Sequence, residues 1–139
     1  MGDLLLQHRA HDKDLYADLW DYSVGEHLQP GETFAEGASR GLDEELGVID
    51  VSLVPLGDVR RVDFVGSGVA DREIQQAFAG VYNGSVQIDE MEVQASHWIA
   101  RDELLAWLHR DASVFTPWFA QDIEELGLRE RWGEVVASL

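Results

Sequence analysis

Apolar residues recur at helical spacing between residues 34 and 46, and this is the clearest periodic pattern in the chain. Thr33 and Glu36 have the spacing of a capping box at the start of this segment. Gly47 suits the position just after the end of a helix. The pattern therefore predicts one helix over residues 34–46.

Shorter apolar runs on either side of this helix predict strands. Two precede the helix, over residues 4–7 and 20–24. The strands expected after it are residues 51–56, 60–65, 73–82, 85–88 (following an Asn83-Gly84 turn) and 93–99. The C-terminal helices are expected within about residues 101–138, as segments 101–109, 117–127 and 129–138. Strands around one early helix, with helices at the end, predict a mixed α/β or α+β domain.

The composition indicates a packed protein. Of the 139 residues, 45% are hydrophobic and five are Trp, which is too apolar for a disordered chain. No repeat or linker divides the sequence, so we expect a single domain over residues 1–139. No apolar run approaches the roughly 20 residues of a membrane helix, and the N-terminus lacks the features of a signal peptide. We therefore expect a soluble, cytoplasmic protein with no membrane partner.

The chain is strongly acidic and contains no Cys. Twenty-seven Asp and Glu against ten Lys and Arg give a formal charge of −17, which argues against nucleic acid as a partner. A protein of this charge needs divalent cations if it handles a phosphate ester. Acidity that serves only solubility, or adaptation to salt, is the alternative. The absence of Cys excludes disulfides, thiolate zinc sites and cysteine nucleophiles.

The candidate chemistry gathers on the predicted helix. Arg40 and Glu44 are four residues apart and can pair on a helix, whereas Glu45 points about 100° away. Carboxylates held together on a rigid helix suit Mg²⁺ or Mn²⁺, which also engage substrate phosphates. Such an ion neutralises a pyrophosphate and acidifies an attacking water. A solvated acidic helix face is the alternative on spacing alone.

Residues 31–48, with the sequence GETFAEGASRGLDEELGV, resemble a Nudix box, whose pattern is G, five residues, E, seven residues, REUxEExGU with U aliphatic. The positions that match are Glu32, Arg40, Leu42, Glu44, Glu45, Gly47 and Val48. The resemblance implies a Nudix α/β/α sandwich with a mixed sheet. It also implies Mg²⁺-dependent hydrolysis of a nucleoside diphosphate linked to another group.

Two positions depart from the box. The opening Gly of the pattern falls on Glu26, although Gly25 is adjacent, so the box region spans residues 25–48. Gly41 stands where many Nudix hydrolases have a Glu that helps to bind metal or acts as a base. Gly41 and Gly37 form a stripe of small residues, for which close packing of a neighbouring element is the alternative explanation.

Outside the box, the chain resembles the Nudix branch of isopentenyl-diphosphate isomerase and its isomerase-like hydrolase relatives. The resemblance is carried by residues 4–10 (LLLQHRA), Lys13, 19–21 (LWD), 23–27 (SVGEH), 71–74 (DREI), 92–93 (EV), Trp98 and 115–119 (FTPWF). The isomerases use a Cys that would fall at Gly25, so the absence of Cys argues against isomerase activity. The resemblance favours a hydrolase of this branch.

The box and the resemblance together give the acidic candidate residues. We expect Glu44 and Glu45 to hold the metal and to act in catalysis, with Glu26 and Glu90 as further metal ligands. Glu92 aligns with a Glu that the isomerases use, and we expect it to take part in catalysis. Either Glu90 or Glu92 could complete the metal site or serve as the base for a metal-bound water. If the segment is extended, Glu90 and Glu92 share one face. An exposed loop of acids is the alternative.

Few cations are available to contact a diphosphate. Arg9 and Lys13 are placed by motif to bind substrate. His27, at a position that is a metal ligand in the isomerases, is a third substrate-binding candidate or a structural residue. Glu32 and Arg40 are expected to support the site, because Arg40 can bind Glu32 and hold the loop shut.

Two expectations concern packing and assembly. Trp20, Trp98 and Trp118 are expected in the core rather than stacked on a nucleotide base. Relatives of this branch carry an edge strand before the LLLQ segment, whereas three residues precede Leu4 here. We therefore expect a Nudix sheet that lacks this edge strand and a homodimer that covers the exposed edge. The alternative is that the first residue of the sequence has been placed too late.

The function predicted from the sequence is that of a pyrophosphatase. It would cleave the diphosphate linkage of a nucleoside di- or triphosphate, or of a nucleoside diphosphate derivative, with Mg²⁺ or Mn²⁺. A catalytically impaired Nudix-fold module that binds nucleotides or regulates is the alternative, and Gly41 is its best evidence.

Overall fold

The computed structural model describes residues 2–13, 16–66 and 69–139. Its strands are β1 (Leu4–Arg9), β2 (Trp20–Asp21), β3 (Val54–Pro55), β4 (Arg60–Gly66), β5 (Val69–Gln75), β6 (Phe78–Ala79) and β7 (Val93–Ile99). Its helices are α1 (Phe34–Leu46), α2 (Arg101–Arg110), α3 (Pro117–Glu125) and α4 (Leu128–Ser138), with a 3₁₀ turn at Ala112–Val114. No helix in the described part of the chain is long and apolar enough to cross a membrane.

Helix α1 begins and ends as the sequence predicts. The Thr33 hydroxyl accepts a hydrogen bond from the N–H of Glu36 at 3.1 Å, and the Glu36 carboxylate accepts one from the N–H of Thr33 at 3.0 Å. Gly47 ends the helix in the left-handed conformation, with φ of 63°. A Cβ is strained in that conformation, which explains the glycine. Local capping chemistry thus fixes both ends of the helix.

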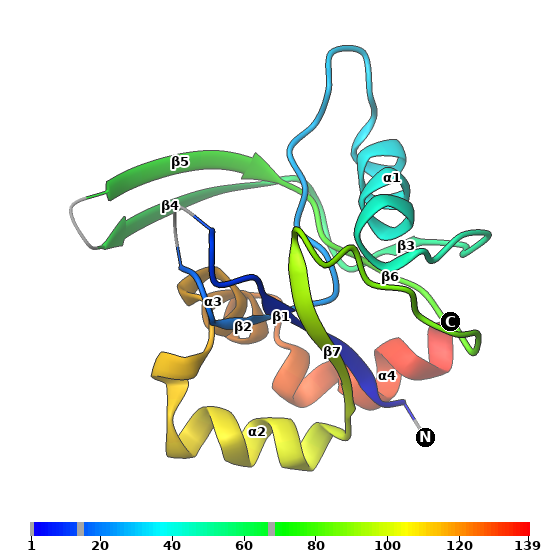
Figure 1. The fold of residues 1–139 in the computed structure, drawn as a ribbon. Coiled ribbons are helices and arrows are strands. Elements are labelled where there is room, and N and C mark those ends of the chain that lie inside the picture. Colours follow the sequence, from blue (N-terminus) through cyan, green and yellow to red (C-terminus); the bar gives the residue numbers. More distant parts are fainter. Residues whose placement is uncertain (1, 14–15, 67–68) are drawn as a thin grey trace.

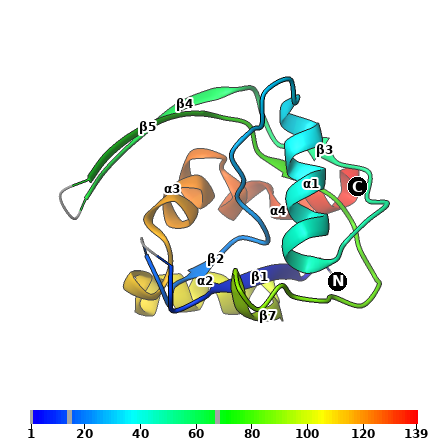
Figure 2. The same cartoon turned by 45° about the horizontal axis from the view of Figure 1, so that its top comes forward.

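The central sheet has the strand order β2-β1-β7, and β1 pairs antiparallel with both neighbours. Successive residues of β1 face opposite sides of the sheet. Leu6 joins the core formed with α2 and α3, whereas Leu5 packs with Leu46 and Val48 at the end of α1. Figures 1 and 2 show the result, with α1 on one side of the β1–β7 pair and α2 on the other. Helices therefore cover both faces of this sheet.

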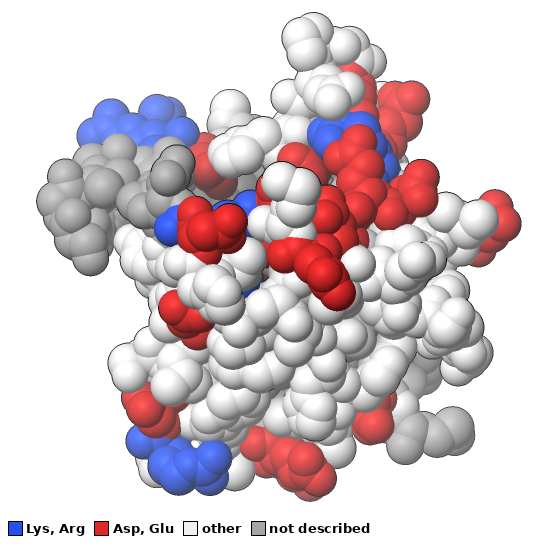
Figure 3. Space-filling model, in the orientation of Figure 1, with Lys and Arg blue, Asp and Glu red and all other residues white. Residues whose placement is uncertain are grey.

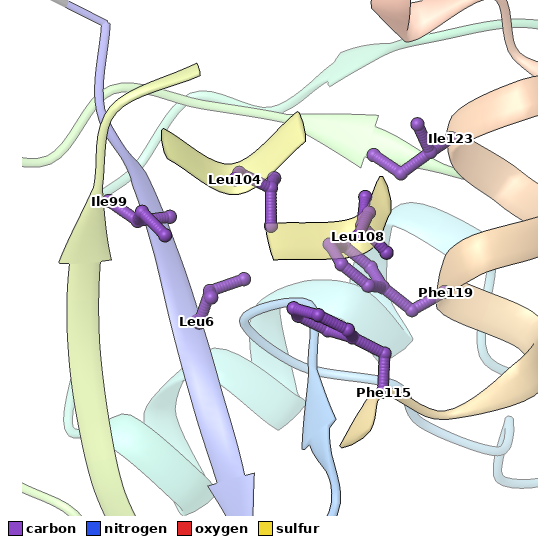
Figure 4. Packing of buried hydrophobic residues seen from close by; sticks show 7 residues of the cluster. All are labelled: Leu6, Ile99, Leu104, Leu108, Phe115, Phe119 and Ile123. Carbon is purple, nitrogen blue, oxygen red and sulfur yellow. The ribbon is translucent and has the colours of Figure 1, made fainter. Parts of the chain in front are cut away.

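The larger core lies between the sheet and helices α2 and α3. Its buried members are Leu6, Ile99, Leu104, Leu108, Phe115, Phe119 and Ile123 (Figure 4). Trp20 and Trp118 pack against this cluster, as predicted. The same prediction is wrong for Trp98, which lies on the side of the sheet that carries its cross-strand partner Leu5 and remains 42% exposed.

Three of the predicted strands are shorter or broken, and of residues 20–24 only Trp20–Asp21 form a strand. Within residues 51–56 only β3 forms, and residues 73–82 divide between the end of β5 and β6. β3 pairs with β6, and β4 pairs with β5 in a hairpin that projects from the body in Figure 1. The described strands pair antiparallel with one another. The parallel pairing that makes the sheet mixed is a single bridge between Trp20 and Phe115.

The predicted strand over residues 85–88 does not form. The N–H groups of Gln87 and Asp89 donate to the carbonyls of Leu46 and Glu45 at the end of α1, both at 2.9 Å. The apolar residues of this segment pack on the core beside the same helix end. The end of α1 therefore provides the hydrogen bonds and the buried contacts that we expected from a neighbouring strand.

Candidate functional site

A loop fastened by Arg40 leads into helix α1. The guanidinium donates to both carboxylate oxygens of Glu32, from Nε at 2.8 Å and from Nη2 at 3.0 Å. It also donates to the carbonyl of His27 at 2.8 Å and to Glu44 at 3.2 Å. Hydrogen bonds from Arg40 hold the pKa of Glu32 below its usual value. Arg40 therefore fixes the loop of residues 25–32 to the helix.

Two glycines let this loop approach α1 closely. A Cβ added at Gly37 would lie 2.5 Å from Cδ2 of Leu28, and one at Gly41 would lie 2.6 Å from Cγ1 of Val24. Close packing, the alternative explanation of the small-residue stripe, is thus confirmed. A Glu at position 41 would have to displace the loop, because the Cβ of Glu26 is also only 3.3 Å away. The path of the loop in this protein therefore requires a glycine at position 41, where the Nudix box has Glu.

Glu45 is the buried carboxylate of the site. It is 9% exposed, and its Oε2 atom has no hydrogen-bond partner among the described residues. Burial raises the pKa of Glu45 to about 7, and the negative charge of Glu26 adds to this effect. The charge of Lys13 and a hydrogen bond with Gln7 act in the opposite direction. A bare, buried carboxylate oxygen near a second carboxylate is a donor set that suits a hard divalent cation.

The carboxylates around Glu45 are more exposed and interact with Arg40. The Glu44 side chain is 56% exposed and lies 3.2 Å from Nη1 of Arg40. The Glu26 side chain is 25% exposed and lies 3.7 Å from the same atom. Among the described residues, no three acidic or histidine side chains are grouped closely enough to hold a metal ion. The predicted carboxylate cluster is therefore a looser arrangement than a completed metal centre.

A turn replaces the extended segment predicted around Glu92. Residues 90–92 form this turn, and the N–H groups of Glu92 and Val93 both donate to the Asp89 carbonyl. The condition for Glu90 and Glu92 to share one face, an extended segment, is therefore not met. Glu92 forms an ion pair with Lys13 and faces the site, whereas Glu90 is exposed at the turn.

The candidate side chains are among the residues that line one broad groove, which extends from β1 and the loop before α1 to β5, β6, α3 and α4. The predicted residues that line it are Arg9, Lys13, Glu26, His27, Glu44, Glu45 and Glu92. Figure 3 shows acidic side chains gathered over the α1 side of this face, around a smaller basic patch. The fold thus brings cations near β1 to the same groove as the carboxylates of α1.

Asp21 is a site residue that the sequence patterns did not single out. It is 3% exposed and accepts hydrogen bonds from Thr116 Oγ1 at 3.1 Å, Trp118 Nε1 at 2.9 Å and the Tyr22 N–H at 2.8 Å. Burial raises the pKa of Asp21 to about 7, although these bonds and the charge of Arg9 oppose the rise. The available signal was a lone Asp inside an otherwise apolar strand.

The family comparison agrees with this geometry. Residues 1–119 match the NUDIX domain. The chain belongs to the NUDIX family. The matched region includes the central sheet and the loop and helix that carry Glu45. The resemblance of residues 31–48 to a Nudix box is therefore confirmed.

Similar proteins of this Nudix chain include isopentenyl-diphosphate Delta-isomerases. The enzyme of Burkholderia multivorans is 35% identical over 134 residues, which cover 94% of this chain and 75% of that enzyme. The enzyme of Corynebacterium diphtheriae is 30% identical over 135 residues, which cover 92% of this chain and 73% of that enzyme. The predicted resemblance to the isomerase branch is confirmed.

Solved structures of Nudix proteins share the fold. A protein of Deinococcus radiodurans has a TM-score of 0.71 at 22% identity, covering 90% of this chain and 75% of its own. The MutT protein of Methanosarcina mazei has a TM-score of 0.68 at 24% identity, covering 91% of this chain and 83% of its own. The NUDIX domain of Shewanella oneidensis NrtR, solved with ADP ribose, has a TM-score of 0.57 at 17% identity, covering 75% and 66%. The predicted Nudix fold is confirmed.

Proposed function

We propose that this protein is a metal-dependent Nudix hydrolase that cleaves the diphosphate linkage of a nucleoside di- or triphosphate or of a nucleoside diphosphate derivative. The observation that carries the proposal is Glu45, whose buried Oε2 has no described hydrogen-bond partner and which shares a groove with Arg9 and Lys13. Cations beside carboxylates suit a diphosphate that arrives with a divalent ion.

The carboxylates at the inner end of the groove would hold the metal. Glu45 supplies the buried ligand, and Glu26 and Glu44 supply the partly exposed ones. When bound, Mg²⁺ or Mn²⁺ neutralises the diphosphate and lowers the pKa of water. The Arg40 guanidinium interacts with both Glu26 and Glu44, and so keeps the Glu26 carboxylate near the Glu44 carboxylate of α1.

The cations bind the phosphates in this proposal. Lys13 is paired with Glu92, and a phosphate oxygen would compete for the same ammonium group. In this proposal Glu92, once released from Lys13, would accept a proton from the attacking water. His27 lines the groove and is a further substrate contact. Glu90 is exposed at the turn, and we assign it no role.

The names of the relatives suggest isomerisation, and two features of this chain argue against that reaction. The Cys that the isomerases use would fall at Gly25, and the chain contains no Cys. A Cβ at Gly25 would lie 2.9 Å from Cε1 of Tyr22, so the tyrosine ring takes up that space. Recognition of a diphosphate is the property that we propose this chain shares with the isomerases.

A nucleotide-binding module without turnover is the second candidate, and Gly41 favours it. Many Nudix hydrolases have a Glu at this position, and the 2.6 Å approach of Val24 to an added Cβ opposes one here. Glu45 remains on the next turn of the same helix as a buried carboxylate. We therefore propose a slow hydrolase rather than an inactive one.

A substrate panel tests the proposal. Purified protein is incubated with nucleoside di- and triphosphates, sugar nucleotides, dinucleotides and isopentenyl diphosphate, each with Mg²⁺, with Mn²⁺ and with EDTA. We expect phosphate or nucleoside monophosphate release that requires the metal. Binding without release would favour the binding module, and conversion of isopentenyl diphosphate to its isomer would contradict our assignment.

We also propose that two chains associate along β7. In the described part of the chain, β7 pairs with β1 on one edge and no strand pairs with its other edge. Trp98 lies on this strand and is 42% exposed. An unpaired edge is a template for a strand of another chain. Light scattering should give the mass of a dimer, and a monomer mass at all concentrations would contradict the proposal.

A further inference from the structure

Arg9 is held from three sides in the groove. Its Nε donates a hydrogen bond to the Tyr16 carbonyl at 3.2 Å. Its guanidinium carbon stands 5.4 Å from the centroid of the Trp118 ring, within the range of a cation–π contact. Its Nη1 lies 3.9 Å from Oδ2 of Asp21. Its side chain is only 18% exposed, so these groups restrict where the guanidinium points.

Asp21 also fixes the ring that lies against Arg9. Nε1 of Trp118 is 3.0 Å from Oδ1 and 2.9 Å from Oδ2 of Asp21. The Tyr16 ring packs edge-on against Trp118, with 5.1 Å between the ring centroids. Asp21 therefore acts on Arg9 in two ways, directly through its charge and indirectly through the orientation of the Trp118 ring.

Asp21 interacts both with hydrogen-bond donors of the fold and with a cation. The Thr116 hydroxyl, the Trp118 Nε1–H and the Tyr22 N–H are donors that a neutral acceptor would also satisfy. A carboxylate that is 3% exposed is costly to desolvate unless a cation compensates. Arg9 lies at salt-bridge distance, with Nη1 3.9 Å from Oδ2 of Asp21, so a negative charge on Asp21 acts on the position of that guanidinium.

We propose that Asp21 is a positioning residue for diphosphate binding, which orients the Arg9 guanidinium toward the phosphates in the groove. The inference rests on the proposed function, because it takes Arg9 as a phosphate contact. A guanidinium that is already oriented loses less side-chain freedom when it forms paired hydrogen bonds to a phosphate. Asp21 itself does not touch the substrate.

A double-mutant cycle with inorganic diphosphate tests the inference. Calorimetric titration in the presence of Mg²⁺ compares the wild type with Arg9→Ala, Asp21→Asn and the double variant. We expect Arg9→Ala to weaken binding about tenfold or more and Asp21→Asn to weaken it about fivefold. In the Arg9→Ala background, Asp21→Asn should add less than about twofold, because its effect passes through Arg9. Equal weakening in both backgrounds would indicate a merely structural role and overturn the inference.

Asp122→Asn is the matched control. Asp122 is 4% exposed and lies 2.8 Å from Nη2 of Arg60, so it is also a buried carboxylate paired with an arginine. This variant should bind diphosphate within about twofold of the wild type. If Asp21→Asn does not fold by circular dichroism, Trp118→Phe replaces it in the cycle. That variant keeps a ring beside Arg9 but removes the donor to Asp21, and the same dependence on Arg9 is expected.

The outcomes separate this inference from the proposed function. If Arg9→Ala binds diphosphate as well as the wild type, the inference is overturned while hydrolysis at Glu45 remains open to its own test. If the double-mutant cycle gives the expected result but no panel compound is turned over, the inference is supported and the proposed hydrolysis is overturned. A wild type that does not bind inorganic diphosphate would overturn the inference, and the substrate panel would still decide the proposed hydrolysis.

Discussion

Replacing Asp21 by Asn should change how the stability of the protein depends on pH. Asp21 is 3% exposed, and burial raises its pKa from 3.8 to about 7. Unfolding returns the carboxyl to water and to its ordinary pKa. Because the folded protein binds this proton more tightly, the stabilisation is complete below the unfolded pKa and is lost as pH rises through the folded pKa.

The size of the effect follows from the difference between the two pKa values. One pKa unit corresponds to about 1.4 kcal/mol. Between pH 5 and pH 8, titration of Asp21 should remove about 3 kcal/mol from the free energy of unfolding. Asn does not titrate. The free energy of unfolding should therefore fall more steeply with pH in the wild type than in Asp21→Asn.

Urea unfolding followed by Trp fluorescence at pH 5, 6, 7 and 8 measures this difference. The attraction between Asp21 and Arg9 exists only when Asp21 is ionised, so its effect is already included in the folded pKa of Asp21. Other titrating groups, such as Glu45, are common to both proteins and cancel to first order. Parallel profiles from pH 5 to pH 8 would mean that Asp21 is ionised throughout, and would refute the argument from burial.

Three further predictions concern the loop, the helix and the metal. Gly41→Ala should lower the free energy of unfolding by about 1 kcal/mol because it crowds Val24. At Gly133 no described atom lies within 4 Å of an added Cβ, so Gly133→Ala should raise the free energy of unfolding by up to about 1 kcal/mol. If both substitutions changed the free energy of unfolding in the same direction, the explanation by crowding would be contradicted. Arg40→Ala should lower the urea concentration at the midpoint of unfolding, because the loop loses its hydrogen bonds to the helix. Arg40→Lys should recover less than half, because Lys cannot form the paired bonds to Glu32, and full recovery would count against that clamp. EDTA should abolish turnover and added Mn²⁺ should restore it, whereas turnover that survives chelation would exclude a role for the metal.

The parts of the fold that depend on local chemistry could be predicted from the sequence. Thr33, Glu36 and Gly47 fix the ends of α1 through contacts within a few residues. The apolar runs of β1 and β7 likewise indicate strands that the structure contains. Residues 85–88 show the same kind of pattern, but they pack on the end of α1 and do not form a strand. Apolar residues in a sequence indicate that a segment is buried, but they do not indicate which element buries it.

The parts of the site that depend on distant contacts could not be predicted. Asp21 is buried by Thr116 and Trp118, which lie 95 and 97 residues later in the chain, so the neighbouring sequence does not show what surrounds it. The turn at residues 90–92 separates Glu90 from the groove, although alternation had suggested a shared face. Glu45 was identified because its helix and its box are both continuous segments of the sequence.

The most direct test of the account measures turnover of the best panel compound by the wild type, Glu45→Gln and Glu134→Gln with saturating Mg²⁺. Glu134 is an exposed carboxylate on α4 and serves as the matched control. The account predicts that Glu45→Gln lowers kcat about 100-fold or more while its circular dichroism is unchanged, and that Glu134→Gln stays within about twofold. Equal turnover by all three proteins would contradict the assignment of Glu45 to the active site.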